Sequence, residues 1–126
     1  MIPTFIKSYV AATAVAGRTI VQFAAPSTDS TVEEADSAAV AAVGIADPLG
    51  ADAGQMLDVH RAGMGEVELG GTVAAGDPLT SDASGKAIKA VAAPGSTIWI
   101  MGYADAPGVS GDYIACFISS GVLHEA

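Results

Sequence analysis

VGIAD at residues 43–47 returns later in the chain as MGYAD at residues 101–105. Further matches follow on both sides, in the same order and at nearly the same offset, which is the sequence signature of an internal repeat. Residues 14–60 and 73–118 are therefore interpreted as two versions of one unit. A solenoid needs about three or more such units to bury a continuous core. The two copies instead predict one β domain with internal pseudo-symmetry over residues 14–126.

Short apolar runs separated by turn residues account for most of the chain. Residues 56–61 and 113–119 have strand character, and residues 66–69 alternate polar and apolar side chains as a strand with one wet face does. The glycine-rich stretches at residues 63–65 and 70–71 are interpreted as hairpin turns. A spacing of roughly 8 to 12 residues between turns indicates an all-β fold.

Residues 31–42 allow two interpretations. The segment begins with a sequence that fits a helix capping box and continues with alanine, the best helix former. The repeat sets its start opposite residues 86–90, where neighbouring Gly and Pro leave too little room for a helix. Strands are predicted here, and a short helix is the alternative.

The formal net charge of −9 argues against two kinds of partner. No Lys or Arg lies between Arg18 and Arg61, while acidic residues are spread through that stretch. Nucleic acid is disfavoured as a direct partner because binding its phosphates needs clustered positive charge. An anionic membrane surface is disfavoured for the same reason, and no apolar run approaches the roughly 20 residues of a membrane span. We expect a soluble protein that binds neither nucleic acid nor membrane.

Catalytic residues, cofactors and metals are not expected. His60 is interpreted as a solvated strand residue rather than a general base, and no Cys/His spacing matches a metal site. The single cysteine, Cys116, lies in an apolar run, where the pKa of a thiol rises and its reactivity falls. Trp99 stands between two isoleucines and is expected to pack in the core rather than to stack on a ligand. The chain is therefore predicted not to be an enzyme.

Residues 1–13 are interpreted as an extended N-terminal arm without a counterpart in the repeat. Terminal segments are usually disordered unless something holds them, and this one carries bulky apolar side chains that need a cover. Its own domain or a neighbouring molecule could supply that cover, and the neighbour is favoured. Main-chain pairing of the arm with an exposed strand edge would provide affinity. The candidate partner-binding residues are Ile2, Pro3, Phe5, Ile6 and Tyr9.

Several segments share their order and spacing with a known family. They are residues 39–47, the glycine-led strand at 54–59, a short glycine-punctuated hairpin, VAAGDPL at residues 73–79, residues 100–104 and a final apolar strand. Over about residues 15–120 they resemble the capsid cement proteins of tailed bacteriophages. The chain departs from the simplest family pattern in the loops at residues 26–36 and 47–53.

The resemblance implies a small, partly open β-barrel or β-clip (β-tulip-like) domain that contains the pseudo-repeat and carries the arm. It also implies a structural protein of the virion, made in the host cytoplasm, that decorates the outer surface of a phage head as a homotrimer. Its partner would be the major capsid protein, whose subunit contacts it would stabilise. No catalytic residue and no cofactor are implied.

Two other functions remain open. VAAGDPLT at residues 73–80 also resembles the opening of antifreeze-like sugar-binding domains, so a small-molecule-binding β-clip module of the sugar-binding type is one alternative. A surface adhesion module is the other.

Overall fold

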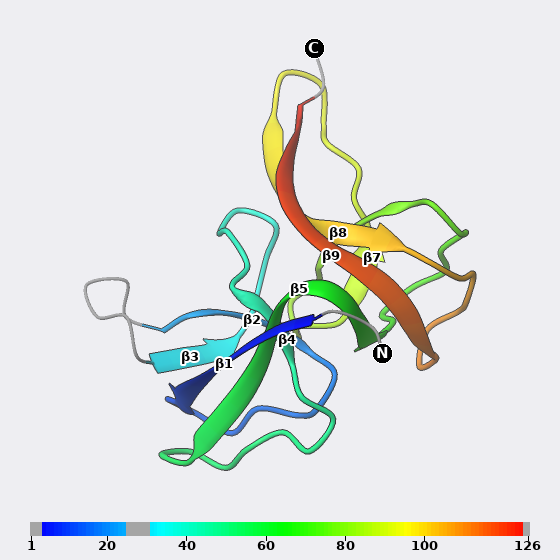
Figure 1. The fold of residues 1–126 in the computed structure, drawn as a ribbon. Coiled ribbons are helices and arrows are strands. Elements are labelled where there is room, and N and C mark those ends of the chain that lie inside the picture. Colours follow the sequence, from blue (N-terminus) through cyan, green and yellow to red (C-terminus); the bar gives the residue numbers. More distant parts are fainter. Residues whose placement is uncertain (1–3, 25–30, 125–126) are drawn as a thin grey trace.

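The computed structural model describes residues 4–24 and 31–124, and within them it consists of strands, turns and loops without a helix (Figure 1). The strands are β1 (Thr4–Ala11), β2 (Ile20–Phe23), β3 (Thr31–Glu34), β4 (Gly44–Ala46), β5 (Met56–Glu68), β6 (Pro78–Ser81), β7 (Ala87–Lys89), β8 (Thr97–Ala104) and β9 (Tyr113–His124). The all-β prediction is confirmed. Residues 31–42 contain β3 and a turn, so the alternative helix is not found there. In the described part of the chain, no helix has the length and apolar character needed to cross a membrane.

The strands form two small barrels that share β5, which passes from one lobe of the molecule into the other (Figure 1). In the first barrel the order β1-β3-β2-β4-β5 closes because β5 also pairs with β1. In the second, the ends of the order β5-β9-β8-β6-β7 are joined by one parallel bridge between Leu69 and Ala87. β5 pairs with β1 from Met56 to Gly63 and with β9 from Gly63 to Glu68. The predicted small barrel is therefore built twice along one strand.

The internal repeat is present in the backbone. Val15 and Ala51 exchange two hydrogen bonds in the first barrel, and Val73 and Gly108 exchange two at the matching place in the second. β2 lies between β3 and β4 in the first copy, as β6 lies between β7 and β8 in the second. The repeated sequence thus encodes one strand arrangement made twice.

The counterpart of β1 is the second half of β5. The backbone N–H of Ala11, at the end of β1, donates to the carbonyl of Gln55 at 2.9 Å, and that of Leu69, just after β5, donates to Asp112 at 2.8 Å. Ala11 also pairs in parallel with β3, as Leu69 does with a residue of β7. Residues 4–11 are therefore the first strand of the first copy. They run antiparallel along β5, where the sequence suggested an arm outside the repeat.

Both copies of the repeated pentapeptide carry glycine where two strands touch. A Cβ atom on Gly44 would lie 2.3 Å from the carbonyl oxygen of His60, and one on Gly102 would lie 2.1 Å from that of Phe117. Side-chain atoms do not fit at such distances, so each strand pair requires a residue without Cβ. The repetition of glycine in the sequence is a steric requirement of the repeated barrel.

Each barrel has its own core, and the two cores match position by position. The core of the first barrel consists of Tyr9, Ala11, Val15, Val21, Val32, Val43, Ala46, Leu57 and Val59. The matching residues of the second are Val67, Leu69, Val73, Leu79, Ala87, Met101, Ala104, Ile114 and Cys116. Ile20, Ala35 and Ile45 of the first copy also pack in the second core, which joins the barrels through side chains as well as through β5.

The hairpin predicted at residues 63–65 is wrong, because β5 continues through them without a break. Gly63 has φ of 87°, a conformation that glycine adopts without steric cost. It lies where β5 leaves the first barrel, and beside it the register with β1 shifts between Phe5 and Ile6. A bulge and a glycine together bend a strand, so the glycines here redirect β5 instead of reversing it.

Candidate functional site

The apolar side chains of β1 divide between the core and the surface. Tyr9 lies opposite Leu57, at an inward position, and is 2% exposed. Its ring meets Phe23 edge-on, with 5.9 Å between the ring centroids. Its hydroxyl accepts a hydrogen bond from Nη1 of Arg61 at 3.0 Å. Tyr9, a candidate partner-binding residue in the sequence, is thus a core residue that fastens β1 to its own barrel.

Phe5 and Ile6 lie on the surface, with 59% and 48% of their area exposed. Ile6 pairs with His60 and Phe5 with Ala62, so Arg61 is left unpaired between them. The extra residue of this bulge lies in β5, so successive residues of β1 still point to opposite faces of the strand, and Phe5 and Ile6 are both exposed where β1 runs past the bulge. The remaining candidates, Ile2 and Pro3, lie outside the described residues.

An exposed apolar surface continues from β1 across three more strands. Phe5 lies opposite Ala62, two residues before Met64 on the same strand. Met64 pairs with Phe117 of β9, which pairs with Tyr103 of β8. Side chains opposite each other on antiparallel strands have Cβ atoms about 4.5–5.5 Å apart, so these residues form one strip. We call this strip, Phe5, Met64, Phe117 and Tyr103, together with the exposed Ile6 next to Phe5, the apolar face.

Sequence reasoning missed the β8 and β9 residues of the apolar face. It interpreted the run around Cys116 as one buried strand, although only alternate residues, Ile114, Cys116 and Ile118, are buried. Phe117 and Tyr103 are 49% and 44% exposed. The available signal was that the aromatic residues of β9 alternate with its aliphatic ones, which places them on the opposite face of the strand.

Charged groups beside the apolar face are paired within the chain. The guanidinium of Arg18 forms an ion pair with Glu66 and lies 4.6 Å from the ring centroid of Tyr113. Nζ of Lys86 lies 3.2 Å from a carboxylate oxygen of Glu68. Because both acidic residues of the second half of β5 have cationic partners, the neighbouring apolar side chains are not surrounded by uncompensated negative charge.

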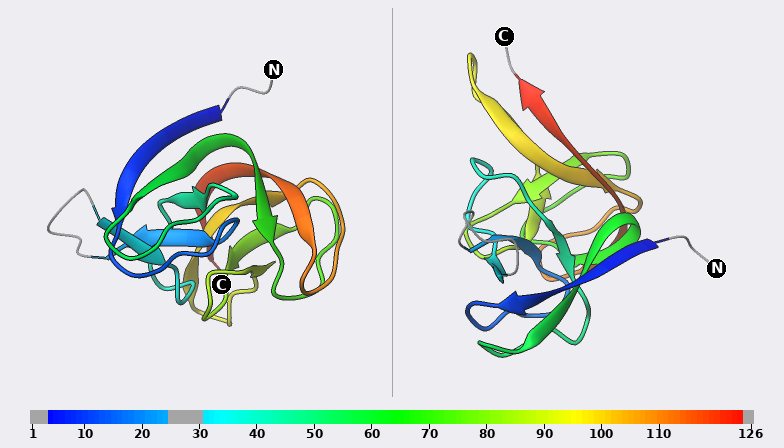
Figure 2. Two further views of the ribbon diagram at one scale, coloured as in Figure 1. Left: turned by 90° about the horizontal axis from the view of Figure 1, so that it is seen from below. Right: turned by 60° about the vertical axis from the view of Figure 1, so that its left-hand side comes forward.

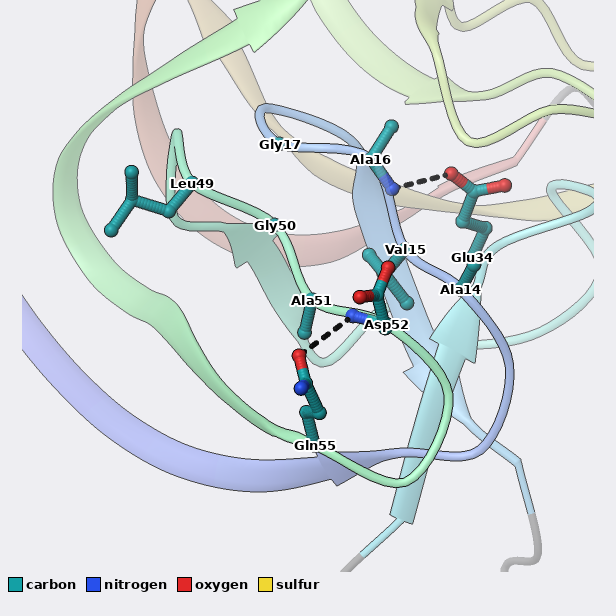
Figure 3. A pocket seen from close by; sticks show the side chains of 10 residues that line it. All are labelled: Ala14, Val15, Ala16, Gly17, Glu34, Leu49, Gly50, Ala51, Asp52 and Gln55. Atoms are coloured by element: carbon teal, nitrogen blue, oxygen red, sulfur yellow. Dashed lines mark hydrogen bonds between the residues drawn. The ribbon is translucent and has the colours of Figure 1, made fainter.

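An open hollow of about 520 Å³ lies beside the first barrel (Figure 3). Its lining consists of Ala14, Val15, Ala16, Gly17, Glu34, Leu49, Gly50, Ala51, Asp52 and Gln55. The Glu34 carboxylate accepts a hydrogen bond from the backbone N–H of Ala16 at 3.0 Å. The backbone N–H of Asp52 donates to Oε1 of Gln55 at 3.4 Å. Most lining side chains are small, and those of Glu34 and Gln55 are hydrogen-bonded to the backbone. The lining therefore contains no nucleophile paired with a base.

The groups considered for chemistry are placed as follows. Nε2 of His60 lies 3.5 Å from Oδ2 of Asp47, on the outer side of the first barrel. Burial, followed by the charge of Asp105, raises the pKa of the Cys116 thiol to about 12. Within residues 4–24 and 31–124, no group of three or more His, Cys, Asp or Glu side chains could hold a metal ion. The core position predicted for Trp99 is wrong, since its side chain is 41% exposed.

Residues 4–116 match the phage cement proteins. The chain belongs to the phage cement protein family. No curated protein matches it. Among solved structures, the head fiber gp8.5 N base in bacteriophage phi29 has a TM-score of 0.66 at 19% sequence identity, over 93% of this chain and 95% of that chain. At this identity the likeness shows a common fold.

This cement protein is accordingly a structural protein of the phage capsid, located in the virion, and the resemblance seen in the sequence is confirmed. Its stretch at residues 73–80, which also resembles the start of sugar-binding modules, lies in the second copy of the repeat and enters β6. The matching bridge at Val15 shows that the same turn and strand occur in the first copy. In this cement protein the sequence VAAGDPLT at residues 73–80 is therefore part of the internal repeat.

Proposed function

We propose that the chain decorates the outer surface of a phage head as a homotrimer and stabilises contacts between subunits of the major capsid protein. Membership of the cement protein family supports the role at the capsid. The observation that carries the proposal is the apolar face, which exposes Phe5, Ile6, Phe117 and Tyr103 on β1, β9 and β8 of a doubly closed β body.

The apolar face suits a protein partner. Soluble monomers rarely leave large contiguous apolar patches exposed unless the patch binds something. Aromatic residues are enriched at the centres of protein interfaces, and Phe117 and Tyr103 of the apolar face come from strands that are paired on both sides. A rigid surface loses little conformational entropy on binding. We therefore assign the capsid contact to this face, with Phe5 and Ile6 at its β1 end.

The backbone of β1 offers a second means of attachment. One edge of β1 pairs with β5 along its length, whereas the other edge pairs with a described strand, β3, only at Val10 and Ala11. An extended capsid segment adding to that free edge would form main-chain hydrogen bonds, and the side chains of Phe5 and Ile6 would define its register. The sequence suggested that the N-terminal segment adds to a strand edge of its partner. In the structure the exposed edge belongs to β1, so we propose that a segment of the partner adds to it.

A trimer would strengthen a modest contact. Linked binding modules that reach their sites simultaneously gain roughly 10² to 10⁴ in avidity over a single one. Three apolar faces on one trimer could each engage a different capsid subunit. This is the arrangement that holds neighbouring subunits together.

Co-sedimentation of the purified chain with empty phage heads tests the proposal. The double variant Phe5→Ser, Ile6→Ser should bind heads at least roughly tenfold more weakly, because burying each of these side chains contributes about 1.5–3 kcal/mol. Leu49→Ser is the matched control, since Leu49 is 93% exposed and lines the hollow instead of the apolar face. Wild-type protein that stays in the supernatant, or a double variant that binds as tightly as Leu49→Ser, would overturn the proposal.

A further inference from the structure

β8 and β9 extend beyond the second barrel as a two-stranded ribbon, formed by residues 97–100 of β8 and 121–124 of β9. The ribbon projects beyond the two barrels in Figure 1 and in the right-hand view of Figure 2. The pairing of β9 with β5 ends at Ile118, and past this residue β8 is the only described strand beside β9. Two-stranded hairpins are marginally stable in water without a further strand or a packed face.

The repeat shows what the ribbon lacks. Residues 119–124 of β9 correspond to the second half of β5, which begins the second barrel and is covered there by β9. Among the described residues, β9 has no strand other than β8 beside it past Ile118. β8 has eight residues where its counterpart β4 has three, and the added residues build the ribbon. The second copy thus extends into a position that, in the first copy, is filled by another barrel.

One face of the ribbon is apolar and exposed. Trp99 and Val122 lie directly opposite each other, with 41% and 55% of their area exposed. The other face is turned toward the protein, since Ile100 is 6% exposed. The backbone N–H of Trp99 donates to the carbonyl of Ala38 at 2.9 Å, which occupies the outer edge of β8. The surface left for a partner is therefore the Trp99 and Val122 face with the adjoining edge of β9.

The distribution of charge indicates which kind of partner binds the ribbon. The chain has a net charge of −9, yet residues 97–100 and 119–123 contain no Asp, Glu, Lys or Arg. A basic partner would gain nothing from an uncharged surface, whereas two copies of an acidic chain repel each other least where neither carries charge. Tryptophan is also the residue most enriched among interface hot spots. We propose that the ribbon is the self-association surface, and that Trp99 and Val122 of each copy contact a second copy of this chain.

The inference deepens the homotrimer of the proposed function and rests on it for the number of copies. Trp99 is the single tryptophan, so its fluorescence reports directly on the ribbon. On concentration of the full-length chain, the emission should shift to shorter wavelength as sedimentation equilibrium shows the monomer disappearing. A wild-type chain that remains monomeric, or that associates without a shift in Trp99 emission, would overturn the inference.

Two variants and a control locate the contact. Val122→Asp keeps the fluorophore and adds like charge to both sides of the contact, and Trp99→Ser removes the central side chain. Each should weaken self-association roughly tenfold or more, while thermal unfolding of the monomer shows that the barrels are intact. Tyr103→Ser, on the apolar face, is the control and should associate as wild type does. Loss of association in Tyr103→Ser alone would place the contact on the apolar face and refute the inference.

Binding to heads is measured separately, so that the two proposals can fail separately. If the ribbon variants lose self-association but the self-associated wild-type protein does not bind phage heads, the ribbon inference stands and the proposed function fails. If wild-type protein binds heads and the ribbon variants associate normally, the proposed function stands and the ribbon inference fails.

Discussion

The hydroxyl of Tyr9 accepts a hydrogen bond from Arg61 across 3.0 Å, joining β1 to the strand that both barrels share. The contact links residues far apart in the sequence at the point where Arg61 bulges out of the β1 register. It explains why a terminal segment that looked independent in the sequence is part of the first barrel.

Replacing Tyr9 separates its hydrogen bond from its packing. Tyr9→Phe should lower the free energy of unfolding by about 0.5–1.5 kcal/mol, the usual net value of one hydrogen bond. Tyr9→Ala should lower it by about 3–5 kcal/mol, because it also leaves a cavity where an aromatic ring was buried. Urea unfolding measures both. Equal stability of Tyr9→Ala and wild type would show that β1 does not depend on its core residue.

Adding a methyl group to either repeated glycine should damage the fold. Gly44→Ala and Gly102→Ala each place a Cβ against a backbone carbonyl that cannot move without parting two strands, and each should cost about 3 kcal/mol of stability. Gly71→Ala is the control, since its Cβ would lie 3.6 Å from a methyl group of Ile88, an ordinary van der Waals distance. Thermal melting of the three variants should leave only Gly71→Ala near wild type. A normal melting temperature for Gly44→Ala would contradict the steric reading of the repeat.

Because the Cys116 thiol is buried, we expect the free energy of unfolding to fall at alkaline pH. Burial raises its pKa from 9.0 to about 12 in the folded chain, so between these values the unfolded chain has lost the thiol proton and the folded chain retains it. The unfolded state then binds fewer protons, and the free energy of unfolding falls as pH rises through this window. Cys116→Val, which copies the residue of the matching position Val59, should show a smaller decline from pH 9 to 12.

The comparison with Cys116→Val isolates the thiol, because every other titrating group is common to both proteins. Identical pH profiles of unfolding would show that the thiol ionises equally in the two states. Alkylation of native Cys116 at neutral pH should likewise be slow until denaturant is added.

Arg18 holds a left-handed conformation, with φ of 63°, at the position where the second copy has Gly76. Arg18→Gly relieves that conformation but removes the ion pair to Glu66 and the stacking on Tyr113. Each of these effects is about 1 kcal/mol or less at a solvated site, so the net change at low salt should be small. Because salt screens the ion pair, the variant should become relatively more stable as ionic strength rises. A variant that loses stability relative to wild type as salt is added would contradict this assignment.

The features that both copies of the repeat share could be predicted from the sequence. The features that occur only once in the fold were predicted wrongly or not at all. The matched glycines and the all-β class followed from local signals, since steric contact and strand alternation leave a mark at each position. The bend at Gly63 did not, because glycine marks a hairpin and a bent strand in the same way. The pairing of β1 with β5 depends on residues about fifty positions apart, which no local pattern reports.

The candidate site was half predicted for the same reason. Phe5 and Ile6 stood out as bulky residues in a terminal segment, and both are exposed. Phe117 and Tyr103 join them only through the register of β5, β9 and β8. Trp99 was assigned to the core from its isoleucine neighbours, but its strand leaves the barrel there and turns one side to solvent.

The shared strand β5 has a mechanical consequence. A molecule made of two barrels would ordinarily flex at the linker between them, but here the connection is itself a strand, held on its flanks by β1, β4 and β9. A tilt of one barrel against the other would have to shear several backbone hydrogen bonds at once. A force applied to β1 is therefore transmitted through the backbone of β5 to the second barrel, and the two barrels are expected to move as one stiff body.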